Sequence, residues 1–145
     1  MIRKMEPSDK QAVIDLAMEF SQERLNDERT YVDPVEASNQ FDQFINLPNI
    51  VAYVAEENGS VVGMLVLVLS PLIFTSRVVA QEIVWYVNKD HRTCGVRLLK
   101  KVEIILKELG CQDIMMTGLD GDHSCDFYER LEYKPFQHSY MKRLV

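Results

Sequence analysis

The chain has 145 residues, of which 47% are hydrophobic and 26% are charged. This length and balance predict a single globular domain over residues 1–145 and exclude a disordered chain or a multidomain assembly. The 22 acidic residues outnumber the 16 basic ones, so the net charge is -6. Such a charge disfavours nonspecific binding to nucleic acid or to an anionic membrane surface.

The first half of the chain predicts a short strand, two helices and a hairpin. Met1 to Met5 is strand-like, and Ser8 with Gln11 has the form of a capping box before a helix with apolar spacing. Asp33-Pro34 supplies an N-cap and a first-turn proline for a second helix, which Pro48 ends. Two β-rich runs, 50–56 and 61–69, flank Asn58-Gly59, which is a strong hairpin signal.

The second half predicts a strand-helix-strand crossover and a C-terminal strand. A third long strand is expected over 78–87, and a helix follows that ends at Gly110. The chain returns as a strand over 112–117, which should run parallel to strand 78–87. A short helix over 124–131 and a basic, strand-like tail over 134–145 complete a mixed α/β domain.

The turn from strand to helix at Val87 to Leu99 is the most informative segment. Backbone amides at the start of a helix can bind phosphate, and Arg92 and Arg97 can add charge-assisted hydrogen bonds. Gly95 is useful there because a Cβ would hold a ligand away from the backbone. These features are also common at helix starts that bind no ligand, so alone they leave both readings open.

Several motifs together resemble the GNAT superfamily of acyl-CoA-dependent N-acyltransferases. The resemblance covers nearly the whole chain and rests on Ile2-Arg3 with Asp9, on the hairpin at Asn58 to Gly63, on the strand Gln81 to Val87, and on the signature Phe127 to Tyr133. It implies a mixed α/β (α+β) fold with a mostly antiparallel sheet of six to seven strands, about four helices and one parallel crossover. The loop at 92–97 is two residues shorter than the family pattern.

The resemblance implies acetyl-CoA as cosubstrate and places its binding residues on one strand and the loop after it. The backbone of Trp85, Tyr86 and Val87 would hold the pantetheine. The pyrophosphate would lie on the loop formed by Arg92, Thr93, Cys94, Gly95, Val96 and Arg97.

Glu82 is the candidate general base. A carboxylate among apolar strand residues is costly to bury, and burial would raise its pKa toward neutrality. The alternative is a structural Glu at a bulge or edge, paired with Arg77 or a lysine, and residue type alone does not separate the two. The resemblance favours the base, because Gln81 to Val84 matches the segment in which some family members place a catalytic glutamate.

Tyr128 is the candidate general acid. A tyrosine on a short helix is most often a packing residue with its hydroxyl at the surface. Within the Phe-Tyr-x-x-Leu signature, however, Tyr128 matches the residue that in many members protonates the leaving thiolate. Glu132 stands where the signature usually has glycine.

These residues predict an N-acetyltransferase that acts on a primary amine of a small molecule or a protein. The acidic residues of segment 21–48 suit a cationic acceptor but are also an ordinary solubility feature: Glu23, Asp27, Glu28, Asp33, Glu36 and Asp42. A non-catalytic acyl-CoA-binding or interaction module on the same fold is the alternative, supported by the shortened loop.

The remaining expectations concern metals, location and assembly. His91, His123 and His138 are scattered and the three cysteines lack CxxC spacing, so we expect no metal site. No segment reaches the roughly 20 apolar residues of a membrane span, and the first residues do not resemble a secretory signal. We therefore expect a cytoplasmic protein, monomeric or homodimeric.

Overall fold

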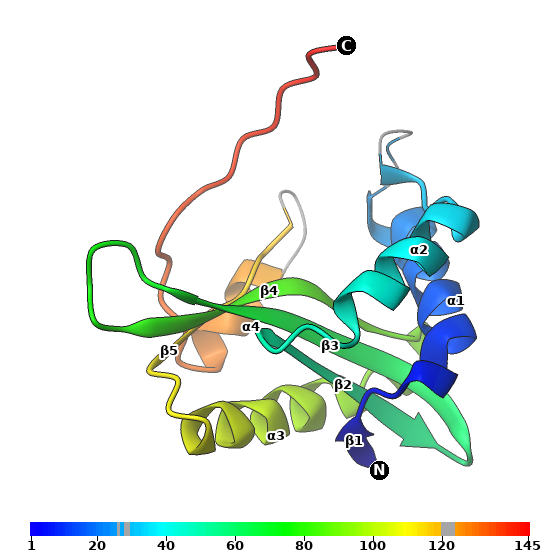
Figure 1. The fold of residues 1–145 in the computed structure, drawn as a ribbon, viewed down its shortest axis with the longest axis horizontal. Helices are drawn as coiled ribbons and strands as arrows, with labels where there is room; N and C mark the ends of the chain where they lie inside the picture. The colour runs from blue at the N-terminus through cyan, green and yellow to red at the C-terminus, as the bar shows by residue number, and fades with distance from the viewer. Residues whose placement is uncertain (26, 28–29, 120–123) are drawn as a thin grey trace. The chain divides into compact units, whose positions relative to one another are not determined.

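The computed structural model describes residues 1–25, 27, 30–119 and 124–145, and it divides into two compact units, 1–115 and 116–145. The first unit contains a five-stranded sheet in the order β1-β2-β3-β4-β5 (Figure 1). Its strands are β1 (Ile2–Lys4), β2 (Ile50–Glu57), β3 (Ser60–Pro71), β4 (Val78–Val87) and β5 (Asp113–Met115). The first four pair antiparallel, while β4 and β5 pair parallel.

The helical elements of the first unit lie on both faces of this sheet (Figure 1). The helices α1 (Lys10–Phe20) and α2 (Pro34–Phe44) lie on one face, and α3 (Cys94–Glu108) packs on the other, against β2, β3 and β4. Short turns connect them: η1 (Pro7–Asp9), the π-helical turn η2 (Ser21–Leu25) and η4 (Lys89–His91). None of the helices in the described ranges is long and apolar enough to cross a membrane.

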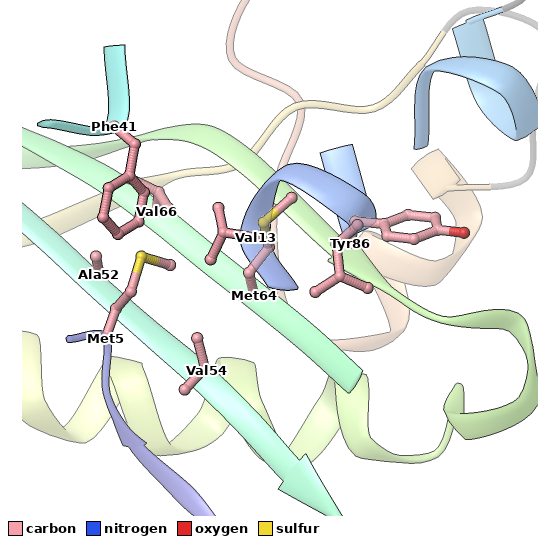
Figure 2. Packing of buried hydrophobic residues seen from close by; sticks show 9 residues of the cluster. Met5, Val13, Phe41, Ala52, Val54, Met64, Val66 and Tyr86 are labelled. Atoms are coloured by element: carbon pink, nitrogen blue, oxygen red, sulfur yellow. The ribbon is translucent and has the colours of Figure 1, made fainter. Parts of the chain in front are cut away.

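Alternating side chains of the strands build the core between the sheet and the first two helices. Val54, Met64 and Val66 point toward this side, where they pack with Met5 and Phe41 (Figure 2). Tyr86 joins the same cluster, and its hydroxyl points away from the other labelled side chains in Figure 2. The core thus holds the ring of Tyr86 in place while its polar end reaches beyond the apolar cluster.

Several local predictions from the sequence are confirmed. Asp33 Oδ1 accepts hydrogen bonds from the backbone of Val35 at 2.9 Å and of Glu36 at 3.3 Å, which is the expected N-cap of α2. Asn58 and Gly59 have φ values of 52° and 78°, as a two-residue hairpin between β2 and β3 requires.

The predicted capping box at Ser8 and Gln11 is wrong. The chain instead turns through η1, where Asp9 Oδ2 accepts the backbone N–H of Glu6 at 2.7 Å. Arg3 forms a bidentate pair with the same carboxylate, through bonds of 2.9 Å to each oxygen. A capping box between Glu6 and Asp9, with Arg3 paired to the same Asp9 carboxylate, therefore fixes this helix start in place of the serine cap.

The predicted six to seven strands are not confirmed. The second unit contains the helix α4 (Ser124–Arg130), and residues 134–145 form neither helix nor strand. Every residue of this tail is exposed, including Phe136, Tyr140 and Met141, so the apolar residues that suggested a strand are not buried. A strand needs a paired edge as well as a suitable composition, and the pattern of a single segment cannot supply that edge.

Candidate functional site

The pairing of the two parallel strands ends directly before Glu82. The β4–β5 ladder covers Val79 to Gln81 on β4, whereas β4 itself continues to Val87. On its other edge, Leu67 pairs with Glu82 and Val66 pairs with Val84, so Ile83 is the extra residue of a β-bulge. Bulges redirect side chains and are common beside active sites, and here one directly follows the half-buried Glu82.

The loop after β4 leads into the N-terminus of α3. Asn88 caps the turn η4 by accepting the backbone N–H of Asp90 at 3.0 Å. The helix itself begins at Cys94 after Thr93, whose side chain makes no capping hydrogen bond. Only Arg92 and Thr93 therefore separate the turn η4 from the first turn of α3.

Close packing against Val87 fixes this loop to the sheet. A Cβ on Gly63 of β3 would lie 2.9 Å from Cγ2 of Val87 and 3.3 Å from the backbone oxygen of Tyr86. A Cβ on Gly95 would lie 3.5 Å from Val87 Cγ2 and 3.6 Å from Trp85, which is ordinary contact. Glycine is therefore sterically required at position 63 but not, by the protein's own atoms, at position 95.

Glu23 connects η2 to the end of β4 and to the loop. Its carboxylate accepts a 2.6 Å hydrogen bond from the hydroxyl of Tyr86 and pairs with Arg92, whose guanidinium lies 5.3 Å from the centre of the Tyr86 ring. Burial opposes ionisation of Glu23, but the hydrogen bonds from Tyr86 and Arg92 outweigh it and hold its pKa below the usual range. Burial and the adjacent Glu23 together raise the pKa of Tyr86.

A second carboxylate, that of Glu57 at the end of β2, contacts the first turn of α3. Its Oε1 lies 3.1 Å from the thiol of Cys94 and 2.8 Å from a guanidinium nitrogen of Arg97. The hydrogen bond from Cys94 and then the pairing with Arg97 lower the pKa of Glu57. Both arginines predicted to bind phosphate thus pair with carboxylates from outside the loop.

Tyr128 lies in the second unit, on α4. Its hydroxyl donates a 3.0 Å hydrogen bond to the backbone oxygen of Thr117, and its ring packs against those of Phe127 and Tyr133. The residue is buried within the fold of the chain. Its hydroxyl is therefore held in a defined direction within that unit.

The structure brings together the predicted cofactor residues, Trp85 to Val87 and Arg92 to Arg97, at the end of β4 and the start of α3. Arg77, considered as a partner of Glu82, instead forms a bidentate pair with Asp113, with distances of 2.6 and 2.8 Å.

Glu28 and His123 lie outside the described residues. Within the described part of the chain, no three potential metal-binding side chains form a group.

Sequence reasoning missed the role of Glu57 and the contacts of Glu23. Glu57 precedes a hairpin and meets Arg97 across 40 positions, and Glu23 meets Arg92 across 69. No local pattern marks such pairs. The one available signal for Glu57 was its place next to the predicted hairpin turn at Asn58-Gly59.

The sheet order, the parallel β4–β5 ladder and the crossover helix define a mixed α/β fold. The model of the acetyltransferase (GNAT) family matches residues 11–133, so the chain belongs to this family. The comparison with curated protein sequences found no match.

Solved structures share this fold at low sequence identity. A transcriptional regulator from Bacillus halodurans C-125 is 20% identical with a TM-score of 0.84, each chain being covered to 99%. A ribosomal-protein-alanine N-acetyltransferase from Brucella melitensis biovar Abortus 2308 is 18% identical with a TM-score of 0.80, covering 99% of this chain and 98% of its own. An aminoglycoside acetyltransferase from an uncultured soil metagenomic sample is 17% identical with a TM-score of 0.77, with 99% and 95% covered.

Proposed function

We propose that the protein transfers an acetyl group from acetyl-CoA to a primary amine while both substrates are bound. The observation that carries this proposal is the end of the β4–β5 pairing at Gln81, directly before Glu82 and the bulge at Ile83. From Glu82 onward β4 has no partner in β5, so a carboxylate lies where the pairing ends. Family membership supplies the class of reaction.

The residues at the end of β4 and in the loop fit the cosubstrate. Backbone groups of Trp85 to Val87 would hold the pantetheine arm in the manner of an added strand. The N-terminus of α3 and the side chains of Arg92 and Arg97 are the donors that a pyrophosphate prefers. Gly95 is buried and faces Val87 and Trp85, so it lets the start of α3 pack closely against the end of β4.

Glu82 and Tyr128 supply the proton transfers in this proposal. Acetyl-CoA provides an activated thioester, and the acceptor arrives as an ammonium ion that cannot attack it. Glu82 accepts one proton from the ammonium, the amine nitrogen bonds to the acetyl carbon, and the carbon–sulfur bond breaks. The Tyr128 hydroxyl gives a proton to the departing thiolate, and the proton lost from the new amide nitrogen returns to the Tyr128 oxygen. Glu82 then releases its proton to water.

The acceptor is proposed as a primary amine of a small molecule or of a protein. Two structural neighbours are named for one acceptor of each kind: a ribosomal-protein-alanine N-acetyltransferase for a protein and an aminoglycoside acetyltransferase for a small molecule. Both are under 20% identical to this chain, so they support the reaction class and leave the choice of acceptor to experiment.

Calorimetry with acetyl-CoA, followed by measurement of free thiol release with a panel of primary amines, tests the proposal. We expect acetyl-CoA to bind and at least one amine to increase thiol release above hydrolysis. Binding without any amine-dependent thiol would favour the alternative, a non-catalytic acyl-CoA-binding module with a shortened loop. Absence of acetyl-CoA binding would overturn both.

A further inference from the structure

Glu57 occupies a position that favours an anion. It ends β2, and the hairpin after it brings its carboxylate against the first turn of α3, within 2.8 Å of Arg97 and 3.1 Å of the Cys94 thiol. The N-terminus of a helix carries a partial positive charge, which stabilises a nearby negative group. In this structure the chain therefore supplies its own anion at the start of the helix where the proposed function places a phosphate.

The pairing of Glu57 with Arg97 is exchangeable. The two side chains are 31% and 63% exposed, and an exposed ion pair of this kind contributes little stability, since water competes with each partner. Arg97 Nη2 also lies 3.3 Å from Cys94 Sγ, so its guanidinium reaches over the helix start. A small rotation of its long side chain can change its partner without moving the backbone.

The second arginine of the loop is held differently. Arg92 pairs with Glu23 and lies over the ring of Tyr86, and Tyr86 itself donates to the same carboxylate. Releasing Arg92 would break this three-residue arrangement, whereas releasing Arg97 breaks an exposed pair and its contact with the thiol. Arg97 is therefore the more available of the two for an incoming phosphate.

We propose that Glu57 competes with the phosphate groups of the cofactor for Arg97 and so sets the affinity of the loop. The proposal rests on the proposed function, because the competing anion is the pyrophosphate of coenzyme A. When phosphate binds, Arg97 exchanges a carboxylate for a phosphate, and the negative charge of Glu57 repels the bound cofactor. Removing that charge increases affinity, in contrast to the loss expected when a binding residue is removed.

Calorimetric titration of four variants with coenzyme A tests this competition. Glu57→Gln keeps the shape of the side chain but removes its charge. We expect it to tighten coenzyme A binding roughly three- to tenfold, because it removes one exposed ion pair and one nearby repulsion. Glu56→Gln removes the same charge one position earlier, from a residue that pairs with Arg3, and should change affinity less than twofold. Arg97→Ala should weaken binding, and adding Glu57→Gln to it should give a smaller gain than in the wild type, because only the repulsion is then relieved.

A second ligand separates competition at the phosphate from a general change of the site. S-acetyl-pantetheine lacks the nucleotide and its phosphates, so Glu57→Gln should leave its affinity unchanged. Thermal unfolding of each variant establishes that it is folded.

The outcomes distinguish this inference from the proposed function. Wild-type binding without a gain in Glu57→Gln, or an equal gain in the Arg97→Ala background, overturns the competition and leaves the proposed function standing. If neither the wild type nor Glu57→Gln binds coenzyme A, the proposed function fails as well. Binding by Glu57→Gln alone would support the competition in its strongest form.

Discussion

Glu82 directly follows the last residue of β4 that pairs with β5. If Glu82 is the general base, the activity of a Glu82 variant should depend on pH in a defined way. Glu82→Gln keeps the size of the side chain but cannot accept the proton of the ammonium. We expect kcat to fall by about 10²-fold or more at neutral pH, the usual contribution of a general base. The deficit should shrink as pH rises toward the pKa of the acceptor amine, because a neutral amine needs no base.

The pH profile of kcat/KM for one amine, measured for the wild type and Glu82→Gln, checks this role. Asp113→Asn is a useful comparison, since it removes a carboxylate on the adjacent strand that pairs with Arg77. An unchanged pH profile in Glu82→Gln would remove this residue from the role of base.

The hydrogen bonds between Asp9 and Arg3 predict an effect of Asp9 on stability. Asp9 is 5% exposed and accepts two hydrogen bonds from Arg3, and these hydrogen bonds lower its pKa. Asp9→Asn leaves Arg3 with a weakened partner and should cost about 1–3 kcal/mol in free energy of unfolding. Asp42→Asn, which breaks an exposed pair with Lys10, should cost less than about 1 kcal/mol.

The contribution of Asp9 should also depend on pH with a defined sign. Because its folded pKa lies below the unfolded value of about 3.9, its stabilisation is fully present above that value and is lost as the pH falls through the folded pKa. Urea unfolding between pH 3 and about 7 should therefore show the wild type and Asp9→Asn converging at low pH. A constant difference across this range would contradict the assignment.

At the scale of elements, substitutions of two glycines, Gly63 and Gly95, test the packing between β3, β4 and the start of α3. Gly95→Ala meets ordinary contacts only, and alanine suits a helix better than glycine, so stability should be unchanged or rise by up to about 1 kcal/mol. If the loop backbone binds pyrophosphate, the added methyl group should nevertheless weaken coenzyme A binding, by roughly two- to tenfold for one impaired hydrogen bond.

Gly63→Ala is the contrasting variant. Its Cβ would lie 2.9 Å from Val87, so it should destabilise the fold by about 1–3 kcal/mol. Combining it with Val87→Ala should recover part of that loss. Thermal unfolding and calorimetry on the same samples check both positions, and a Gly95→Ala variant with full affinity would argue against a phosphate contact at that backbone.

The elements that the sequence predicted well are those with local signals. The hairpin at Asn58-Gly59, the cap at Asp33 and the C-terminal end of α3 near Gly110 each depend on the conformational preferences of one or two residues. The cap at Ser8 failed because Glu6 and Asp9 form the capping box two residues earlier, and Arg3 holds the Asp9 carboxylate. The tail at 134–145 failed as a strand because composition does not supply a pairing edge.

The candidate site likewise contains residues that a local sequence signal marks and residues that it does not. Its cofactor residues follow one another along the chain and carry a recognisable motif, so the sequence could place them. The carboxylates that pair with Arg92 and Arg97 come from η2 and from the end of β2, and only the folded chain brings them to the loop.

For the whole molecule, the structure changes what the net negative charge implies about the acceptor. Three acidic residues expected to face a cationic acceptor make internal contacts instead: Glu23 with Arg92 and Tyr86, Asp33 at the cap of α2, and Asp42 with Lys10. The net charge of -6 therefore says less about the acceptor than the sequence suggested. Acceptor selectivity has to come from the shape and local groups of the site.

The most direct test of the central claim is a crystal structure of the protein with coenzyme A. We predict that the pantetheine lies along β4 from Trp85 to Val87, that the pyrophosphate lies on the loop from Arg92 to Arg97, and that Arg97 has exchanged Glu57 for a phosphate oxygen. Coenzyme A bound elsewhere on the protein, with the loop and its ion pairs unchanged, would contradict the account.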